Sequence, residues 1–332
     1  MSNAARSVDN PIAALEHSIR LSVTPEQLRS WMRPRPLRVF TDLVLNWAGI
    51  FLAFYLMGHF QSVLAYVVGA IWIGLRMYAL FIMGHDGAHF CLHPNHKIND
   101  LIMRWLILGP MGMELEDGRR NHLLHHKTVG TTSDPDRYIH SLVNKNSVSQ
   151  FLLFCSGLAT FQRTVRKVTT LPKASPDGTK ELSKVAGLRH FLKQRIPIMV
   201  TQPLVILALW LFHIPIWLYP VLWVAPVYFG VFLPDELRAF CDHAVERVPD
   251  EAADESRLVS FRTNWIEAMF YAPYNMNLHA EHHIWPGVPY YNRQEVYKFL
   301  RTNPSVTYRN SYTVFLLELI TKLPVLQAKA IE

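Results

Sequence analysis

Two long apolar tracts dominate the chain. Residues 196–234 contain no Asp, Glu, Lys or Arg, and His213 is their only charged-type side chain. Residues 43–83 form a second tract, which is interrupted by a short polar patch at 58–62 and by Arg76. A helix needs about 20 apolar residues to cross a bilayer. Each tract is about twice that length, so each predicts two spans joined by a tight turn.

The pattern therefore predicts an all-α integral membrane protein with four transmembrane helices in two hairpins. We expect the spans at about residues 40–58, 62–83, 196–213 and 215–233. The rest of this single domain, 1–332, is expected to form an N-terminal segment and a helical cap, at 1–38, 84–195 and 234–332. The alternative is a large soluble core. It is disfavoured because soluble helices usually carry a polar stripe, and these tracts do not.

Basic residues predict the orientation of the chain. Neither expected hairpin turn, near His59 and near His213, carries Lys or Arg, whereas residues 1–38 hold six arginines. The other basic residues lie almost wholly after the second and fourth spans. By the positive-inside rule, both termini and the cap should be cytoplasmic.

Charge and cysteine content narrow the function further. The net charge of +7 fits a membrane surface with anionic headgroups. We see no reading element for nucleic acid, so no nucleic-acid partner is expected. Three cysteines with no C-x2-C pair fit a reducing cytoplasm and exclude an iron–sulfur or rubredoxin-type module within these residues.

Eight of the sixteen histidines fall into three clusters in the cap segments. At this chain's histidine frequency, roughly 0.04 H-x2-H-H triplets would be expected by chance, yet two occur. Spacings of i, i+3 and i, i+4 let several imidazoles converge on one metal. The clusters are His85 and His89; His122, His125 and His126; and His279, His282 and His283.

The number of histidines predicts two metal ions. Eight or nine nitrogen ligands exceed what one tetrahedral zinc uses, and no Cys or Met interleaves with them to favour copper(I) or a zinc finger. Iron is the expected metal if the chemistry is oxidative. A non-enzymatic membrane metal carrier is the remote alternative. It is disfavoured because a transporter places ionisable groups inside its spans.

The three clusters resemble the histidine boxes of the membrane fatty acid desaturase superfamily. The strings HDGAH, HLLHH and HAEHH occur in box order between paired spans, and Asp134-Pro135-Asp136 and Trp285-Pro286 resemble the sequences that frame the boxes. The resemblance covers about residues 40–300. It implies a non-haem di-iron enzyme that uses O2 to desaturate or hydroxylate a long acyl or lipid-like chain. The eight box histidines carry over as iron ligands, and His243 matches an extra ligand after the fourth span.

Two details place the chain outside the acyl-CoA Δ9 branch. Three residues, not four, separate His85 from His89, and Ala239 stands where that branch has an asparagine. Carboxylates near the boxes are candidate hydrogen-bond partners of the ligands. They are Asp86, Asp134, Asp136, Asp242 and Glu281. Histidines expected not to be ligands are His17, His59, His93, His96, His140, His190 and His213.

The resemblance also implies an external electron donor of the ferredoxin, rubredoxin or cytochrome b5 type, since no haem or flavin motif is fused to the boxes. The basic cytoplasmic face favours an acidic carrier. A desaturase is the preferred reading. A hydroxylase or ketolase on the same scaffold, acting on fatty acyl, sphingolipid or carotenoid substrates, stays open because it shares the boxes.

Overall fold

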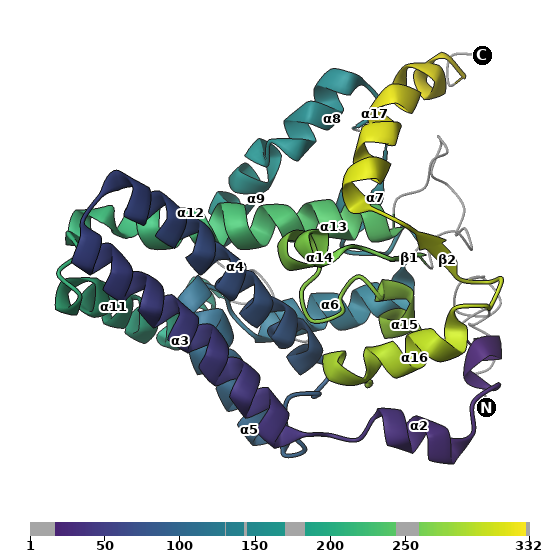
Figure 1. Cartoon of the computed structure of the whole chain (residues 1–332), viewed down its shortest axis with the longest axis horizontal. Helices are drawn as coiled ribbons and strands as arrows, with labels where there is room; N and C mark the ends of the chain where they lie inside the picture. Colours follow the sequence, from purple (N-terminus) through teal and green to yellow (C-terminus); the bar gives the residue numbers. More distant parts are fainter. Residues whose placement is uncertain (1–16, 130, 143–144, 170–182, 244–258, 330–332) are drawn as a thin grey trace. The chain divides into compact units, whose positions relative to one another are not determined.

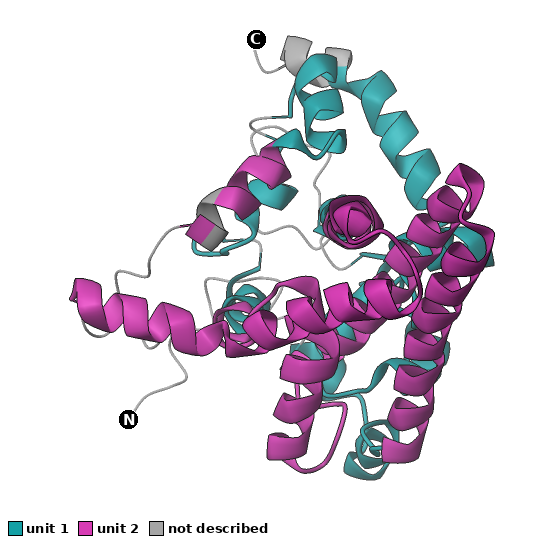
Figure 2. Cartoon of the chain, turned by 90° about the vertical axis from the view of Figure 1, so that its left-hand side faces the viewer, with its two compact units in different colours: residues 1–34, 121–158, 233–332 teal, residues 35–120, 159–232 magenta. Residues whose placement is uncertain are grey.

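The chain folds almost entirely into helices (Figure 1). This computed structural model describes residues 17–129, 131–142, 145–169, 183–243 and 259–329. They form two compact units, each assembled from separate stretches of sequence (Figure 2). Unit 1 comprises residues 1–34, 121–158 and 233–332, and unit 2 comprises residues 35–120 and 159–232.

Unit 2 contains the first predicted hairpin. Helices α3 (Pro36–Phe60) and α4 (Val63–Ala88) pack side by side and match the spans expected at 40–58 and 62–83. The turn between them is two residues long. Gln61 adopts a left-handed backbone conformation that ends α3, and the Ser62 side chain accepts a hydrogen bond from the Ala65 N–H to begin α4.

The second apolar tract is less regular than expected. Helix α11 (Ile196–Leu211) is bent by 45° from α10 (Lys184–Gln194), and the two meet the length and hydropathy needed to cross a membrane only as a pair. The fourth predicted span lies in a helical run over Ile216–His243. Three helices are thus long and apolar enough to cross a membrane, or four if the bent pair is one span.

Helix type changes repeatedly within unit 2. After α5 (His96–Ile102) the chain forms a π-helix and a 3-10 turn. The fourth predicted span alternates between 3-10, π and α geometry. Polar side chains satisfy the backbone at these breaks. Gln202 and Trp223 both donate hydrogen bonds to the carbonyl of Pro110, at 2.9 and 2.8 Å. The irregular elements are η1 (Met103–Leu108), η2 (Gly109–Met111), η3 (Ile216–Leu218), η4 (Pro220–Val224), α12 (Ala225–Val227) and η5 (Tyr228–Phe232).

Unit 1 is built mainly from short helices. It also contains a parallel pair of three-residue strands, β1 (Val259–Phe261) and β2 (Thr307–Arg309), so the all-α prediction was wrong in this detail. Strands this short carry no hydrophobic alternation that a sequence pattern could show. The helices are α2 (Pro25–Trp31), α6 (Glu116–Thr128, from Asn121 on), α7 (Arg137–His140), α8 (Val148–Cys155), α13 (Leu233–His243), α14 (Trp265–Tyr271), α15 (His279–Ile284), η7 (Tyr290–Asn292), α16 (Arg293–Leu300) and α17 (Tyr312–Lys329); α9 (Leu158–Thr169) lies mostly in unit 2.

An aromatic core holds the N-terminal helix of unit 1 against the third histidine box. The Trp31 and Trp285 rings meet edge to face with centroids 5.4 Å apart, and both are buried. Arg20 donates to the carbonyl of Ile284 at 2.6 Å, and the Asn292 amide donates to that of Trp31 at 2.7 Å. The residues directly after the box are therefore fixed by contacts from a distant part of the sequence.

A glycine pair sets the packing of α4 against η5 within unit 2. A Cβ added at Gly230 would lie 2.6 Å from the Cα of Gly74, and backbone atoms cannot move aside as a flexible side chain does. We expect Gly230→Ala to destabilise the protein by about 1–3 kcal/mol through overpacking. The measurement is the thermal unfolding midpoint in detergent. Gly118→Ala in α6 is the matched control, because nothing lies within 4 Å of its added Cβ. Equal midpoints for the two variants would contradict the packing argument.

Candidate metal centre

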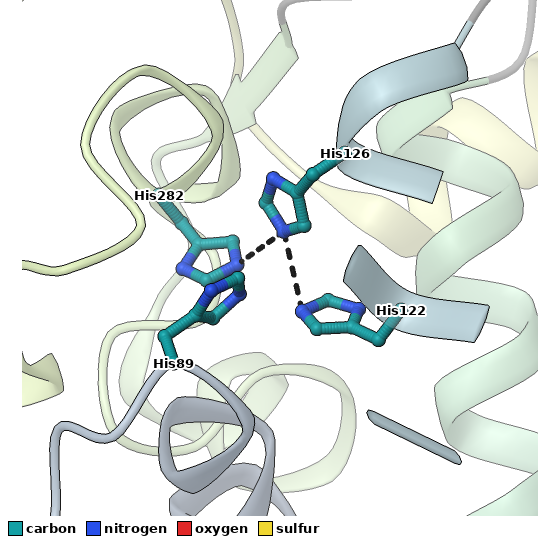
Figure 3. Close-up of side chains that lie close together, drawn as sticks. All are labelled: His89, His122, His126 and His282. Atoms are coloured by element: carbon teal, nitrogen blue, oxygen red, sulfur yellow. Dashed lines mark hydrogen bonds between the residues drawn. The ribbon is translucent and has the colours of Figure 1, made fainter. Parts of the chain in front are cut away.

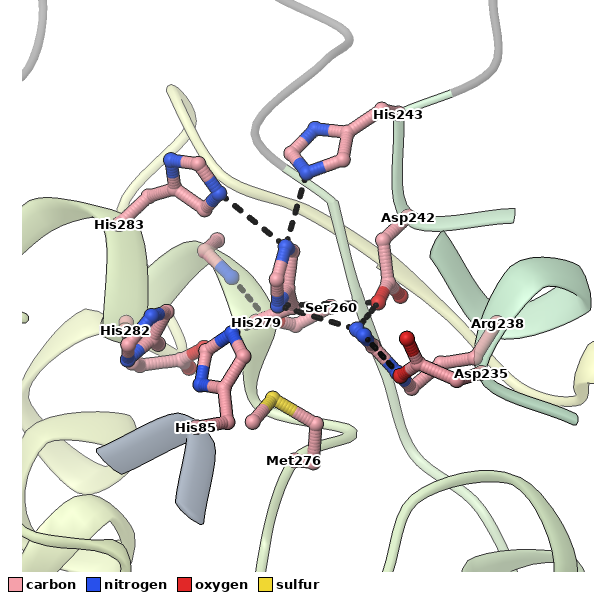
Figure 4. Close-up of polar contacts among 12 residues, drawn as sticks. His85, Asp235, Arg238, Asp242, His243, Ser260, Met276, His279, His282 and His283 are labelled. Atoms are coloured by element: carbon pink, nitrogen blue, oxygen red, sulfur yellow. Dashed lines mark hydrogen bonds and ion pairs between the residues drawn. The ribbon is translucent and has the colours of Figure 1, made fainter. Parts of the chain in front are cut away.

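Four buried imidazoles in unit 1 turn the same ring atom, Nε2, toward one another. Figure 4 shows three of them, His243, His279 and His283. The Nε2 atom of His243 lies 2.8 Å from that of His279 and 3.3 Å from that of His125. The Nε2 atoms of His279 and His283 are 3.1 Å apart. All four side chains are nearly inaccessible to solvent. The four residues come from three helices, α6, α13 and α15, and we call them the buried group.

A second set of histidines from unit 1 converges in the same way (Figure 3). The Nε2 atom of His126 lies 3.2 Å from that of His122 and 3.1 Å from that of His282. His122 and His126 are partly exposed, whereas His282 is fully buried. We call these three residues the outer group. Seven of the nine predicted ligands are thus brought together in one unit.

The two H-x2-H-H boxes divide their histidines reciprocally between these groups. In an α-helix, residues i and i+4 share a face, while neighbours are turned by about 100°. In α6, the i, i+4 pair His122 and His126 joins the outer group, and His125 joins the buried group. In α15 the i, i+4 pair His279 and His283 joins the buried group, and His282 joins the outer group. Each helix therefore serves both groups.

Asp134 orients the ring of His125. Its Oδ1 atom lies 2.9 Å from the Nδ1 atom of His125, and the side chain is buried. Burial alone would raise the pKa of Asp134, but its hydrogen bond with His125 and the neighbouring imidazole of His140 outweigh burial and hold that pKa well below its usual range. An ionised carboxylate accepts a hydrogen bond from Nδ1–H, which keeps the proton on Nδ1 and leaves the lone pair of His125 on Nε2. Asp134 was correctly predicted as such a partner.

Two side chains lie near Nδ1 of His279: the expected Asp242 and an arginine, Arg238 (Figure 4). Arg238 is buried and donates to the carboxylates of Asp242 and Asp235, each at 2.7 Å. The Nδ1 atom of His279 lies 3.7 Å from an oxygen of Asp242 and 3.4 Å from a nitrogen of Arg238. The hydroxyl of Tyr312 donates to the other oxygen of Asp242 at 3.1 Å. This network fixes the last turn of α13, which carries His243.

Glu281 was predicted as a ligand partner and plays another part. Its carboxylate accepts hydrogen bonds from the hydroxyls of Ser260 in β1 and Tyr308 in β2, the latter at 2.7 Å. Burial raises the pKa of Glu281, although these two hydrogen bonds favour its ionised form. The contacts tie the middle of α15 to the strand pair. Glu281 thus positions the helix that carries three histidines.

The geometry of the buried group fits a metal ion. Imidazole nitrogens that bind a first-row metal at about 2.0–2.1 Å lie about 3.4 Å apart in a tetrahedral arrangement. The closest nitrogen pairs of the buried group are separated by 2.8–3.3 Å, slightly less than this spacing. Neutral imidazole is also a ligand that suits iron. The donors are all nitrogen, as the sequence predicted.

Comparison with known families agrees with this arrangement. The model of the family described as fatty acid desaturase matches residues 61–310, well over half of the chain. The chain belongs to the fatty acid desaturase family. A comparison with curated proteins returned no match. Family membership makes this chain an oxidoreductase whose chemistry is directed at a fatty-acid-like substrate, with a histidine cluster able to hold metal.

The first histidine box of this desaturase-family chain lies at the C-terminal end of α4, in unit 2. His85 is in the last turn and His89 is the C-terminal cap, with ring centroids 6.2 Å apart. The two nearby histidines expected not to bind metal make local contacts instead. His96 stacks on Phe90 at 4.0 Å, and Nδ1 of His93 accepts from the Asn95 N–H. The carboxylate of Asp86 lies 3.9 Å from Nδ1 of His85.

Sequence reasoning missed two residues that touch the histidine groups. Arg293, fully buried in α16, lies 3.1 Å from Nδ1 of His282, and an arginine can only donate. His140 was set aside as a non-ligand, yet it is buried and forms a group with His125 and Asp134. The position of His140, four residues after Asp136, could have indicated that it lies near the second box. Nothing in the sequence marked Arg293.

Loss of one hydrogen bond to Glu281 tests the role of the strand pair. We expect Tyr308→Phe to lower the free energy of unfolding by about 1–3 kcal/mol, because a buried carboxylate loses a donor. Tyr297→Phe is the matched control. Its ring packs edge-on against Tyr308 with centroids 5.4 Å apart, and this contact survives loss of a hydroxyl. Thermal unfolding of the purified protein measures both. A Tyr308 variant as stable as the Tyr297 variant would show that the carboxylate does not need this bond.

Proposed function

We propose that this chain is a membrane-bound, O2-dependent desaturase with two iron ions, which introduces a double bond into a long acyl or lipid-like chain. The observation that carries the proposal is the convergence of seven histidine Nε2 atoms into a group of four and a group of three. Two adjacent nitrogen-rich groups suit a pair of metals rather than one.

The first box completes the ligand set in this proposal. The outer group has only three nitrogen ligands, and His85 and His89 are the remaining box histidines. The proposed ligands of the two irons are His85, His89, His122, His125, His126, His243, His279, His282 and His283. Bound iron would reduce dioxygen and would supply the oxidising power that breaks an unactivated C–H bond.

Electron balance requires an external donor. Reduction of O2 to two waters takes four electrons, and removal of two hydrogens from the substrate supplies two of them. The other two electrons must come from a carrier, because the described residues hold no C-x2-C pair or cysteine cluster. We propose a ferredoxin, rubredoxin or cytochrome b5 as that carrier. Its docking side would be the cytoplasmic side, where we expect both termini and the active site from the distribution of basic residues.

The protein's own residues hold the ligands rather than react. Asp134 keeps Nε2 of His125 unprotonated and turned toward the buried group. Asp242, Arg238 and Tyr312 fix the end of α13. Burial of the four imidazoles excludes water from that side of the centre.

Metal analysis tests the ligand assignment. The purified protein, produced with added iron, should contain two irons per chain. We expect His125→Ala and His282→Ala each to lower the iron content to one or fewer and to abolish turnover, because they remove a ligand from different groups. His190→Ala in α10 is the control and should keep both irons. A wild-type protein that binds one zinc and no iron would overturn the proposal.

Product analysis tests the reaction. Lipids from cells that express the chain should contain species lighter by two hydrogens than those of cells expressing His282→Ala, as measured by mass spectrometry. Desaturation leaves no oxygen in the product, since both oxygen atoms leave as water. Products that instead gain one oxygen atom would replace the desaturase with a hydroxylase on the same scaffold.

A further inference from the structure

His140 is buried beside the buried group, although it belongs to none of the histidine boxes. Its exposed fraction is 1%. Its ring centroid lies 4.5 Å from that of His243 and 5.3 Å from that of His125. An imidazole in this position touches two of the four residues of the buried group.

Asp134 joins His140 to His125. One carboxylate oxygen, Oδ1, lies 2.9 Å from Nδ1 of His125 and accepts the N–H of Asp136 at 2.9 Å. The other oxygen, Oδ2, faces Nδ1 of His140 at 3.4 Å. The two hydrogen bonds on Oδ1 and the close approach of His140 to Oδ2 restrict rotation of the carboxylate about its last side-chain torsion. The plane of the carboxylate in turn fixes the ring of His125.

Helix α7, which carries His140, is itself held in place. The buried ammonium of Lys145 donates to the carbonyls of Tyr138 and Ser141, at 2.7 and 2.8 Å. The same ammonium lies 4.7 Å from the ring centroid of Phe154, which is buried. Helix α7 also packs against α13, which ends at His243. His140 is therefore placed by the contacts of its own helix.

We infer that His140 is a positioning residue of the metal centre: through Asp134 it holds His125 with its Nε2 lone pair turned toward the buried group. Nδ1 of His125 and Nδ1 of His140 both face the same carboxylate, and a proton on Nδ1 of each ring is the arrangement that suits it. This inference rests on the proposed role of His125 as a metal ligand. It adds a residue to the centre that is neither a box histidine nor a carboxylate.

Two amide substitutions distinguish a role of His140 as a donor through Nδ1 from its other possible roles. The amide nitrogen of asparagine occupies nearly the position of histidine Nδ1, whereas that of glutamine corresponds to Nε2. His140→Asn keeps a donor for Asp134, and His140→Gln moves it away. Both variants are polar, and asparagine leaves the larger gap in the packing. A packing effect alone would therefore harm His140→Asn more than His140→Gln.

The experiment uses the full chain in detergent with Co2+ as the spectroscopic probe and a competing chelator to measure affinity. We expect His140→Gln to weaken Co2+ binding about 10- to 100-fold and to shift the ligand-field absorption bands, as loss of a partner behind a ligating histidine does. His140→Asn should stay within a few-fold of wild type with unchanged bands. Thermal unfolding midpoints establish that both variants are folded.

Each other outcome has a definite meaning. Equal affinity and equal spectra for His140→Gln and wild type would overturn the inference, as would equal losses in the two variants. A lower number of bound Co2+ ions in His140→Asn would make His140 a ligand and also overturn it. If the wild-type chain binds no metal, the proposed function fails instead, before any variant is compared.

Discussion

The proposed metal centre depends at His125 on one constraint, the position of a single proton on the imidazole. A histidine that binds through Nε2 must carry its proton on Nδ1, and a buried Nδ1–H needs an acceptor. His125 meets this requirement through the carboxylate of Asp134. Other parts of unit 1 support the histidines in different ways: His140 of α7 lies against Asp134, Asp242 of α13 lies 3.7 Å from Nδ1 of His279, and the strand pair holds α15 through Glu281.

Much of the fold could be predicted because bilayer-length apolar tracts leave few choices. The expected spans at 40–58 and 62–83 correspond to α3 and α4, and the polar patch between them becomes a two-residue turn. The convergence of the histidines within each box could be predicted as well, since residues at i, i+3 and i+4 lie close together on a helix. The ligand role of the nine histidines and the side of the membrane on which they lie remain predictions.

The unpredicted features have physical causes. Arg293 reaches His282 only because η7 and α16 fold back onto α15, a tertiary contact with no local pattern. The strand pair joins residues 48 positions apart, Val259 with Thr307, and its segments are too short to show periodicity. Helix α11 needs α10 to reach membrane-spanning length, and the bend between them cannot be read from hydropathy. His140 lacked a box motif, so only its burial beside Asp134 showed where it belongs.

The reciprocal division of the two H-x2-H-H boxes has a mechanical consequence. Each of α6 and α15 sends a same-face pair of imidazoles to one group and the neighbouring residue to the other. A small rotation of either helix about its axis would draw imidazoles toward one group while pulling one away from the other. In the two-metal centre that we propose, the geometry of each site would therefore constrain that of its neighbour.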